Sequence, residues 1–301
     1  MPRGKNIQLF LIDGDASGRI KCTLANWTGV AYKLSRNDLK KCKDREDLAQ
    51  SGVYFLFGTS DKTEDNVVYV GQAGIRKNGE GILGRLQEHK KDDRKDYWTE
   101  AVVFTTSNNS FGPTEISYLE HRFTSIAQTA KRYTIKNANE PVSGGTPTEE
   151  KESELEEFID HARLIMGVLG HKVFEPYIKS KCTADDDILA DNNENLLFLS
   201  RTIKKTGITV KATCMRTPEG FVVRKGAKIN LDDFDYIPHG AKVRREIAKK
   251  DKIDENGILL EDMLFNSATY ASCFVIGANS NGQTRWKNAE GKSLREIELE
   301  E

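Results

Sequence analysis

The sequence lacks several features that would narrow its class at once. It has five cysteines in 301 residues, and no two of them form a C-x-x-C pair. An odd number of widely spaced cysteines argues against a zinc site or a disulfide framework. Free thiols favour a reducing compartment, so a cytoplasmic location is expected. No apolar run approaches the roughly 18 residues that a membrane span needs, so no membrane partner is expected.

The sequence also has almost no net charge, since the formal charge is −1 at pH 7. The charge is unevenly distributed along the chain, however. Residues 1–145 carry a basic excess of four, residues 146–200 an acidic excess of eight, and residues 201–301 a basic excess of three. The total therefore does not exclude a nucleic-acid partner, although any affinity for DNA has to come from local geometry more than from bulk charge.

Turn-forming residues and hydrophobic patterns divide the chain into four segments. Residues 1–50 alternate as strand, turn and strand before a short helix, which predicts an N-terminal extension. Residues 51–145 combine strands and amphipathic helices, as expected for a small α/β core. Residues 146–205 contain an acidic helix and then a polar stretch that predicts a linker. Residues 206–301 are expected to form a C-terminal α+β accessory domain.

The pattern within residues 51–145 predicts a sheet flanked by helices. Apolar runs at 53–57, 67–70 and 98–105 are expected to form three antiparallel strands, the first two of them as a hairpin. Apolar residues recur at helical spacing at 83–91 and 114–130. The predicted fold class is therefore α/β (α+β), with a three-stranded antiparallel core.

Polar residues of this core follow a pattern that points to chemistry. A G-V-Y tripeptide ends at Tyr54, and a Y-V-G tripeptide begins at Tyr69, so two tyrosine hydroxyls can lie side by side on paired strands. Arg85 and His89 are four residues apart and should share a helix face. Glu120 lies at the edge of an apolar helix face, where a carboxylate loses hydration unless a partner or a metal compensates.

Together these residues resemble the GIY-YIG nuclease family, which is named for its two tripeptides. The resemblance covers residues 51–141, with valine in place of isoleucine in both tripeptides. It extends to Arg85, His89 and the Y-L-E motif that ends at Glu120. Asn137 and Asn139 compete for the final asparagine of the family, and Asn137 is favoured.

The resemblance leaves a further polar position open. His89, Tyr97 and Trp98 compete for it. Residues 206–297 are also similar to a small domain of unknown function that often follows such nucleases. The stretches R-T-P-E-G-F at 216–221 and N-G-Q-T-R-W at 281–286 carry this second likeness.

The resemblance implies a metal-dependent endonuclease that hydrolyses DNA phosphodiester bonds. It implies that Glu120 holds a single Mg²⁺ or Mn²⁺ ion, that Tyr54 is the general base towards water, and that Tyr69 positions water or the phosphate. Arg85 would supply a planar donor fork for the phosphate. Because the ordinary pKa of tyrosine is about 10, Arg85, His89 or the metal would have to stabilise the phenolate. A homodimer is expected if both strands are cut, since one active site cuts one strand per event.

Two other functions remain open at this stage. The chain could be a non-catalytic DNA-binding module that keeps the nuclease fold, and it would then bind DNA with a steep salt dependence and without a metal. It could also be an interaction protein that recruits a partner through its acidic helix.

Overall fold

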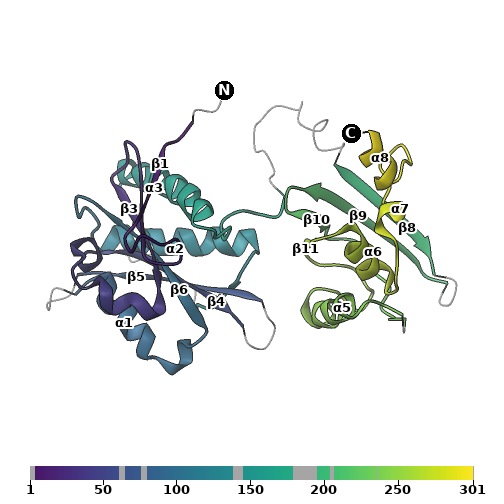
Figure 1. Ribbon diagram of the computed structural model, residues 1–301, viewed down its shortest axis with the longest axis horizontal. Helices are drawn as coiled ribbons and strands as arrows, with labels where there is room; N and C mark the ends of the chain where they lie inside the picture. Colours follow the sequence, from purple (N-terminus) through teal and green to yellow (C-terminus); the bar gives the residue numbers. More distant parts are fainter. Residues whose placement is uncertain are drawn as a thin grey trace. The chain divides into compact units, whose positions relative to one another are not determined.

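The chain forms two compact units, Met1–Pro176 and Tyr177–Glu301, and each is described by itself. The computed structural model (Figure 1) describes residues 4–60, 65–75, 80–137, 145–178, 195–203, 207–234 and 236–300. Within these ranges, no helix combines the length and the apolar character that crossing a membrane requires.

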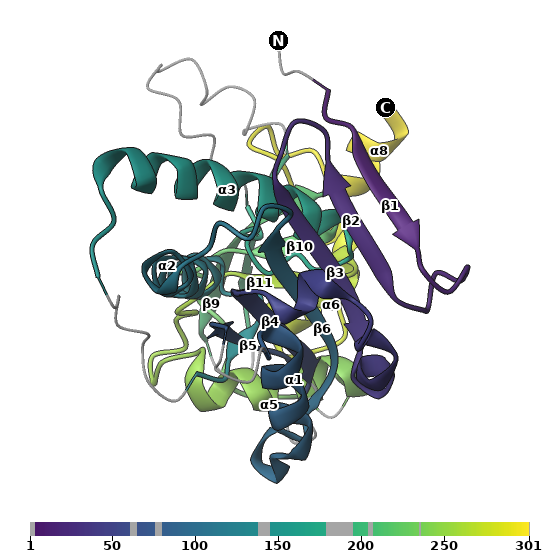
Figure 2. The same ribbon diagram turned by 90° about the vertical axis from the view of Figure 1, so that its left-hand side faces the viewer.

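The N-terminal unit is built on a seven-stranded sheet with the order β1-β2-β3-β6-β4-β5-β7. Neighbouring strands are antiparallel except for β5 and β7, which are parallel. Figure 2 shows β1, β2 and β3 side by side at one end of this sheet. The strands are β1 (Ile7–Leu11), β2 (Ile20–Leu24), β3 (Gly29–Ser35), β4 (Gly52–Thr59), β5 (Asn66–Ala73), β6 (Trp98–Thr106) and β7 (Thr134–Ile135).

Helices cover both faces of this sheet, so its central strands are buried on both sides. On β4, Val53, Phe55 and Phe57 pack with α2 and α3, whereas Tyr54 and Leu56 pack with α1 and the short 3-10 helices. This alternation follows from the two-residue period of a strand. The helices are η1 (Arg36–Cys42), η2 (Glu46–Ala49), α1 (Ile82–Lys91), η3 (Asp93–Lys95), α2 (Pro113–Ala130) and α3 (Glu149–Val168).

The structure extends the expected three-stranded core to seven strands. The three expected strands are present as β4, β5 and β6, and β4 lies between the other two. Residues 1–50, expected to be an extension, supply three more strands, and the short helix expected there consists of η1 and η2. β3 pairs with the outer edge of β6 from Gly29↔Thr106 to Ser35↔Glu100. The physical reason is that β6 is buried along most of its length, so the backbone N–H and C=O groups of its outer edge need partners, which the similarly buried β3 supplies.

The acidic helix α3 belongs to the N-terminal unit instead of connecting two domains. Its apolar face contributes to the same core as α2. Two of its glutamates also contact α2 within the same unit. The Tyr118 hydroxyl on α2 donates to Glu156 at 2.7 Å and to Glu152 at 3.1 Å, and Arg122 forms an ion pair with Glu156 at 2.6 Å.

The C-terminal unit contains a four-stranded antiparallel sheet with the order β11-β10-β9-β8. Its first strand lies within residues 146–205, which were expected to form a linker. There, alternate residues of L-L-F-L-S-R-T are buried, which is the period of a half-buried strand. Its elements are β8 (Leu196–Thr202), β9 (Thr209–Thr217), β10 (Gly220–Val223), α5 (His239–Asp251), β11 (Met263–Phe265), α6 (Ala268–Ile276), α7 (Gly282–Arg285) and α8 (Leu294–Glu300).

Four cysteines lie within the described residues, and all four are buried free thiols. They are Cys22, Cys42, Cys214 and Cys273. Burial raises the pKa of each of these thiols, so they are protonated and unreactive at neutral pH. They therefore act as small core residues. The fifth cysteine, Cys182, lies outside the described residues.

Candidate functional site

The register of β4 and β5 brings the two expected tyrosines onto one face of the sheet. Tyr54 is opposite Gly71, and Leu56 is opposite Tyr69. Tyr54 and Tyr69 are therefore diagonal neighbours, and their ring centroids are 6.3 Å apart. The pairing expected from the two tripeptides thus places both rings on the side of the sheet that α1 covers.

The glycine of the second tripeptide has a specific steric role. A Cβ atom on Gly71 would lie 2.4 Å from both Cζ and Oη of Tyr54. The phenol ring therefore lies directly over the backbone of β5, in space that any other residue would fill. Gly71 is what allows the Tyr54 hydroxyl to reach past β5 towards α1.

The Tyr54 hydroxyl is in hydrogen-bond contact with His89 on α1. Tyr54 Oη lies 2.6 Å from His89 Nε2, and the imidazole ring is 5.4 Å from each tyrosine ring. His89 is almost completely buried. This burial, together with the positive charges of Lys95 and Arg85, lowers the pKa of His89 to about 3. The imidazole is therefore neutral at physiological pH and can accept a proton at one nitrogen.

Arg85 lies one helical turn before His89 and influences both tyrosines. Its Nη1 is 2.7 Å from Glu88 on the same helix. Burial raises the pKa of Tyr54 and of Tyr69, while the Arg85 guanidinium acts in the opposite direction on both. Burial is the larger effect, so both phenols are protonated in the free protein.

Lys95 is a member of this cluster that sequence reasoning missed. It ends η3, shortly after α1, and its ammonium lies 3.3 Å from the centre of the Tyr69 ring. Burial and the nearby Arg85 lower the pKa of Lys95 to about 8. Among the described residues, no carboxylate lies within 4 Å of its Nζ. Lys95 lies in a run of charged residues after a helix, and nothing in the sequence pattern distinguishes it from the charged residues around it.

Glu120 on α2 reaches the cluster from the opposite face of the sheet. One of its oxygens accepts a hydrogen bond from Gln72 Nε2 at 2.9 Å, and Gln72 was also missed. Burial raises the pKa of Glu120, although Gln72, Arg85 and Lys95 partly offset this effect. The Glu120 charge in turn raises the pKa of both tyrosines. The Glu120 charge therefore influences both tyrosines from the other face of the sheet.

Asn137 has a different position from the other expected residues. It follows β7, and its side-chain amide forms two hydrogen bonds with the backbone of Val70. Its Oδ1 accepts from the Val70 N–H at 3.1 Å, and its Nδ2 donates to the Val70 carbonyl at 2.9 Å. The amide thereby continues the short β7 pairing along β5. We assign Asn137 a positioning role for the Y-V-G strand; Asn139 lies outside the described residues.

The three residues that compete for the remaining polar position differ in their contact with Tyr54. Only His89 among the three candidates has a hydrogen bond to that hydroxyl. Trp98 packs in the core, with the Arg36 guanidinium 5.0 Å from its ring centre. Tyr97 lies near Tyr69, and burial raises its pKa to about 12. The Tyr97 hydroxyl is buried without a hydrogen-bond partner among the described residues.

Glu120 is the residue of this site that we tested for its fit to a metal ion. Within the described ranges, no group of three or more His, Cys, Asp or Glu side chains could hold a metal ion. Mg²⁺ nevertheless often keeps several waters and binds through one or two carboxylates. Glu120 fits that pattern, because it is a partly buried carboxylate whose pKa is raised by burial and which a cation would stabilise.

Comparison with known proteins gives one match. Residues 201–298 match the model of a domain of unknown function (DUF4357), which agrees with the similarity of residues 206–297 to such a domain. No GIY-YIG nuclease model matches the chain, so that resemblance rests on the residues described above. No curated protein and no solved structure matches the chain.

Proposed function

We propose that the N-terminal unit is a metal-dependent endonuclease of the GIY-YIG type that hydrolyses DNA phosphodiester bonds. The observation that carries the proposal is the hydrogen bond of 2.6 Å between Tyr54 Oη and neutral His89 Nε2. This pair lies beside Tyr69, two cations and one carboxylate. Phosphodiester hydrolysis needs these groups, namely a proton acceptor for water and positive charge for the phosphate.

Each residue of the site has its own role in the proposed reaction. Arg85 and Lys95 bind the phosphate oxygens, and the negative phosphate raises the proton affinity of His89. With its own proton on Nδ1, His89 accepts the Tyr54 proton at Nε2 while Tyr54 Oη takes a proton from water. The resulting hydroxide oxygen bonds to phosphorus, and the bond from phosphorus to the leaving oxygen breaks. The leaving oxygen takes up a proton from solvent, and His89 releases to solvent the proton that it accepted. Glu120 would hold a Mg²⁺ or Mn²⁺ ion, which supplies charge stabilisation when it is bound.

The structure suggests why His89 is needed in this scheme. Burial raises the pKa of Tyr54 above its ordinary value, so the phenol does not lose its proton to solvent at pH 7. His89 can take this proton only once the phosphate is bound, because the negative charge of the phosphate raises the low pKa of the imidazole. A cytoplasmic location is part of the proposal and is supported by the four buried free thiols.

Nicking of supercoiled plasmid tests the proposal. Wild-type protein should nick DNA with Mg²⁺ or Mn²⁺ and lose this activity in EDTA. Glu120→Gln should lower the rate by at least about 100-fold, the typical loss when one electrostatic group of an active site is removed. Glu157→Gln is the matched control, because Glu157 is an exposed glutamate of α3, and it should nick normally.

Two outcomes would contradict the proposal. One is a Glu120→Gln protein with normal circular dichroism that nicks at the wild-type rate. The other is DNA binding by the wild type without any nicking in either metal. That second result would favour the non-catalytic DNA-binding module, which the raised pKa values of both tyrosines also favour.

A further inference from the structure

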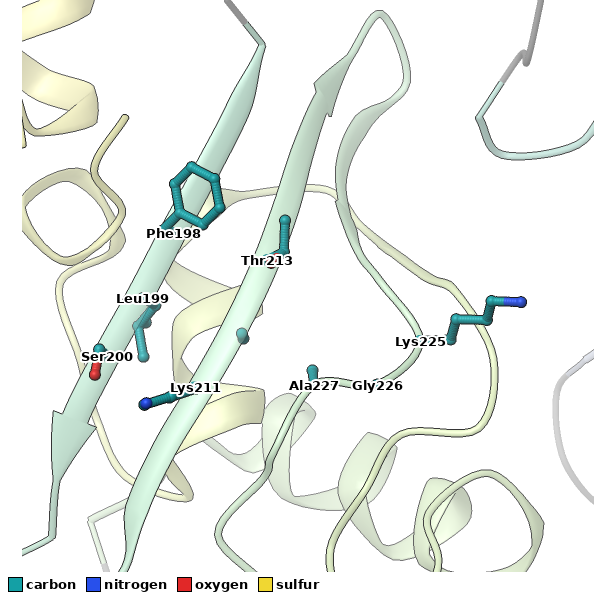
Figure 3. A pocket seen from close by; sticks show the side chains of 9 residues that line it. Phe198, Leu199, Ser200, Lys211, Thr213, Lys225, Gly226 and Ala227 are labelled. Carbon is teal, nitrogen blue, oxygen red and sulfur yellow. The ribbon is translucent and has the colours of Figure 1, made fainter. Parts of the chain in front are cut away.

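The C-terminal sheet has an open groove on the face that α6 leaves uncovered. The groove has a volume of about 360 Å³ and runs over β8, β9 and the segment that follows β10 (Figure 3). This volume lies near the lower end of ligand pockets, which span roughly 300–1,000 Å³. Its lining residues are Phe198, Leu199, Ser200, Lys211, Ala212, Thr213, Lys225, Gly226 and Ala227.

The aromatic ring of Phe198, in the middle of β8, lies on this face. Leu197 and Leu199 point into the core, so the alternation of β8 turns Phe198 and Ser200 outward. Phe198 is 40% exposed, and Thr213 on β9 lies opposite it. Figure 3 shows the Phe198 ring beside Thr213. An exposed phenylalanine on a sheet presents a flat apolar surface.

The two charged residues that line the groove are both lysines, and Asp262 lies next to the lining, where its Oδ1 accepts a hydrogen bond from the Lys225 N–H at 2.8 Å. Lys211 and Lys225 are exposed, and the lining contains no carboxylate. Lys211 pairs with Ser200, and Figure 3 shows its ammonium directed towards that serine. Among the described residues, no carboxylate lies within 4 Å of either ammonium. A ligand of this groove should therefore be an anion.

We propose that this groove binds a single-stranded nucleic acid, with one base stacked on Phe198 and the adjacent phosphate on Lys211. An aromatic face next to a basic and hydroxyl-bearing strand is the combination that binds such strands on sheets. A duplex keeps its bases stacked internally and would leave the Phe198 face unused. An acidic peptide would use the lysines but not the ring. This site is separate from the proposed nuclease centre and does not depend on hydrolysis.

Fluorescence anisotropy of labelled (dT)12 with the full chain in EDTA tests the groove. Phe198→Ala should weaken binding about tenfold, as expected when one stacked base is lost. Phe198→Leu keeps the apolar bulk without the ring face and should lose a similar amount, whereas Phe198→Trp should retain binding. Lys211→Ala should weaken binding and make its dependence on salt shallower by about one unit of slope. Leu299→Ala and Lys250→Ala remove exposed side chains outside the groove and should bind like the wild type.

Several results would overturn the inference. The inference is wrong if Phe198→Leu and Lys211→Ala both bind (dT)12 with wild-type affinity. It is also wrong if the wild-type protein does not bind (dT)12. Equal competition by duplex DNA would show that stacking is not used. Equal competition by inorganic pyrophosphate would mean that the groove takes a free anion. Because EDTA is present throughout, these results do not depend on nicking, and a Glu120→Gln protein that still nicks would refute only the nuclease proposal.

Discussion

At the scale of single residues, the neutrality of His89 is the most consequential property of the N-terminal unit. A histidine with a pKa of about 3 stays uncharged throughout the pH range in which most proteins are folded. It contacts Tyr54 without competing with Arg85 for a negative ligand. In the proposed reaction, His89 accepts the Tyr54 proton once the phosphate is bound, while Arg85 and Lys95 supply the positive charge.

Lys95 should give DNA binding a characteristic pH dependence. Its pKa is lowered to about 8, so the ammonium is charged below that pH and loses its charge as the pH rises through it. Affinity measured in EDTA should therefore fall above about pH 8, by at most about tenfold per pH unit. Lys95→Arg keeps a charged group and should abolish this fall.

The control for this prediction is Lys91→Arg, which changes an exposed lysine of the neighbouring helix. This variant should keep the alkaline loss of affinity of the wild type. If Lys95→Arg loses affinity at alkaline pH in the same way as Lys91→Arg, the titration of another group is responsible.

The sequence predicts some of the site residues much better than others. Tyr54, Tyr69, Arg85 and His89 lie on regular elements, where a two-residue or four-residue spacing determines which side chains share a face. Lys95 and Gln72 join the cluster through tertiary packing. No spacing within a strand or helix indicates that Gln72 contacts α2 or that η3 turns back over Tyr69. These contacts depend on how the elements pack.

At the scale of elements, the pairing of β4 with β5 is the feature on which the site depends most. Gly71→Ala would place a methyl group 2.4 Å from the Tyr54 ring and force one of the two strands to shift. We expect a loss of about 1–3 kcal/mol in the free energy of unfolding, as is typical of overpacking. Nicking should fall as well, because the displaced ring loses its contact with His89. Urea denaturation gives the first quantity and the plasmid assay the second.

Gly74→Ala is the matched control for this element. Its added Cβ would have Ile116 Cδ1 as its nearest neighbour, at 3.8 Å, which is an ordinary contact. Equal stability of the Gly71→Ala and Gly74→Ala proteins would show that β4 and β5 tolerate the methyl group, contrary to our expectation.

Two strands that the sequence analysis did not identify, β3 and β8, were missed for a shared physical reason. The residues of β3 were expected in an N-terminal extension, but its apolar residues complete the sheet beside β6. β8 was expected in a linker, although its Leu197 and Leu199 alternate with outward residues as in other half-buried strands. Periodicity indicates that a segment is a strand. It does not indicate which edge the strand joins, because that depends on residues distant in the sequence.

At the scale of the whole molecule, each unit has its own buried core. Phe123 belongs to the core shared by α2, α3 and the seven-stranded sheet, and Phe274 to the core under the C-terminal sheet. Phe123→Ala and Phe274→Ala should each destabilise one unit by about 3–5 kcal/mol. Differential scanning calorimetry should show two transitions, with each variant lowering the temperature of only one. A single transition that both variants lower equally would show that the chain unfolds as one cooperative unit.

The close approach of Tyr54 to Gly71 also constrains how this chain can change during evolution. The two positions are 17 residues apart in the sequence, yet a side chain at position 71 and an aromatic ring at position 54 exclude each other. A side chain at position 71 can therefore coexist with the ring at position 54 only if one of the two strands shifts. The two tripeptides are thus a single packing unit, and we expect a change in either of them to alter which residues the other can accept.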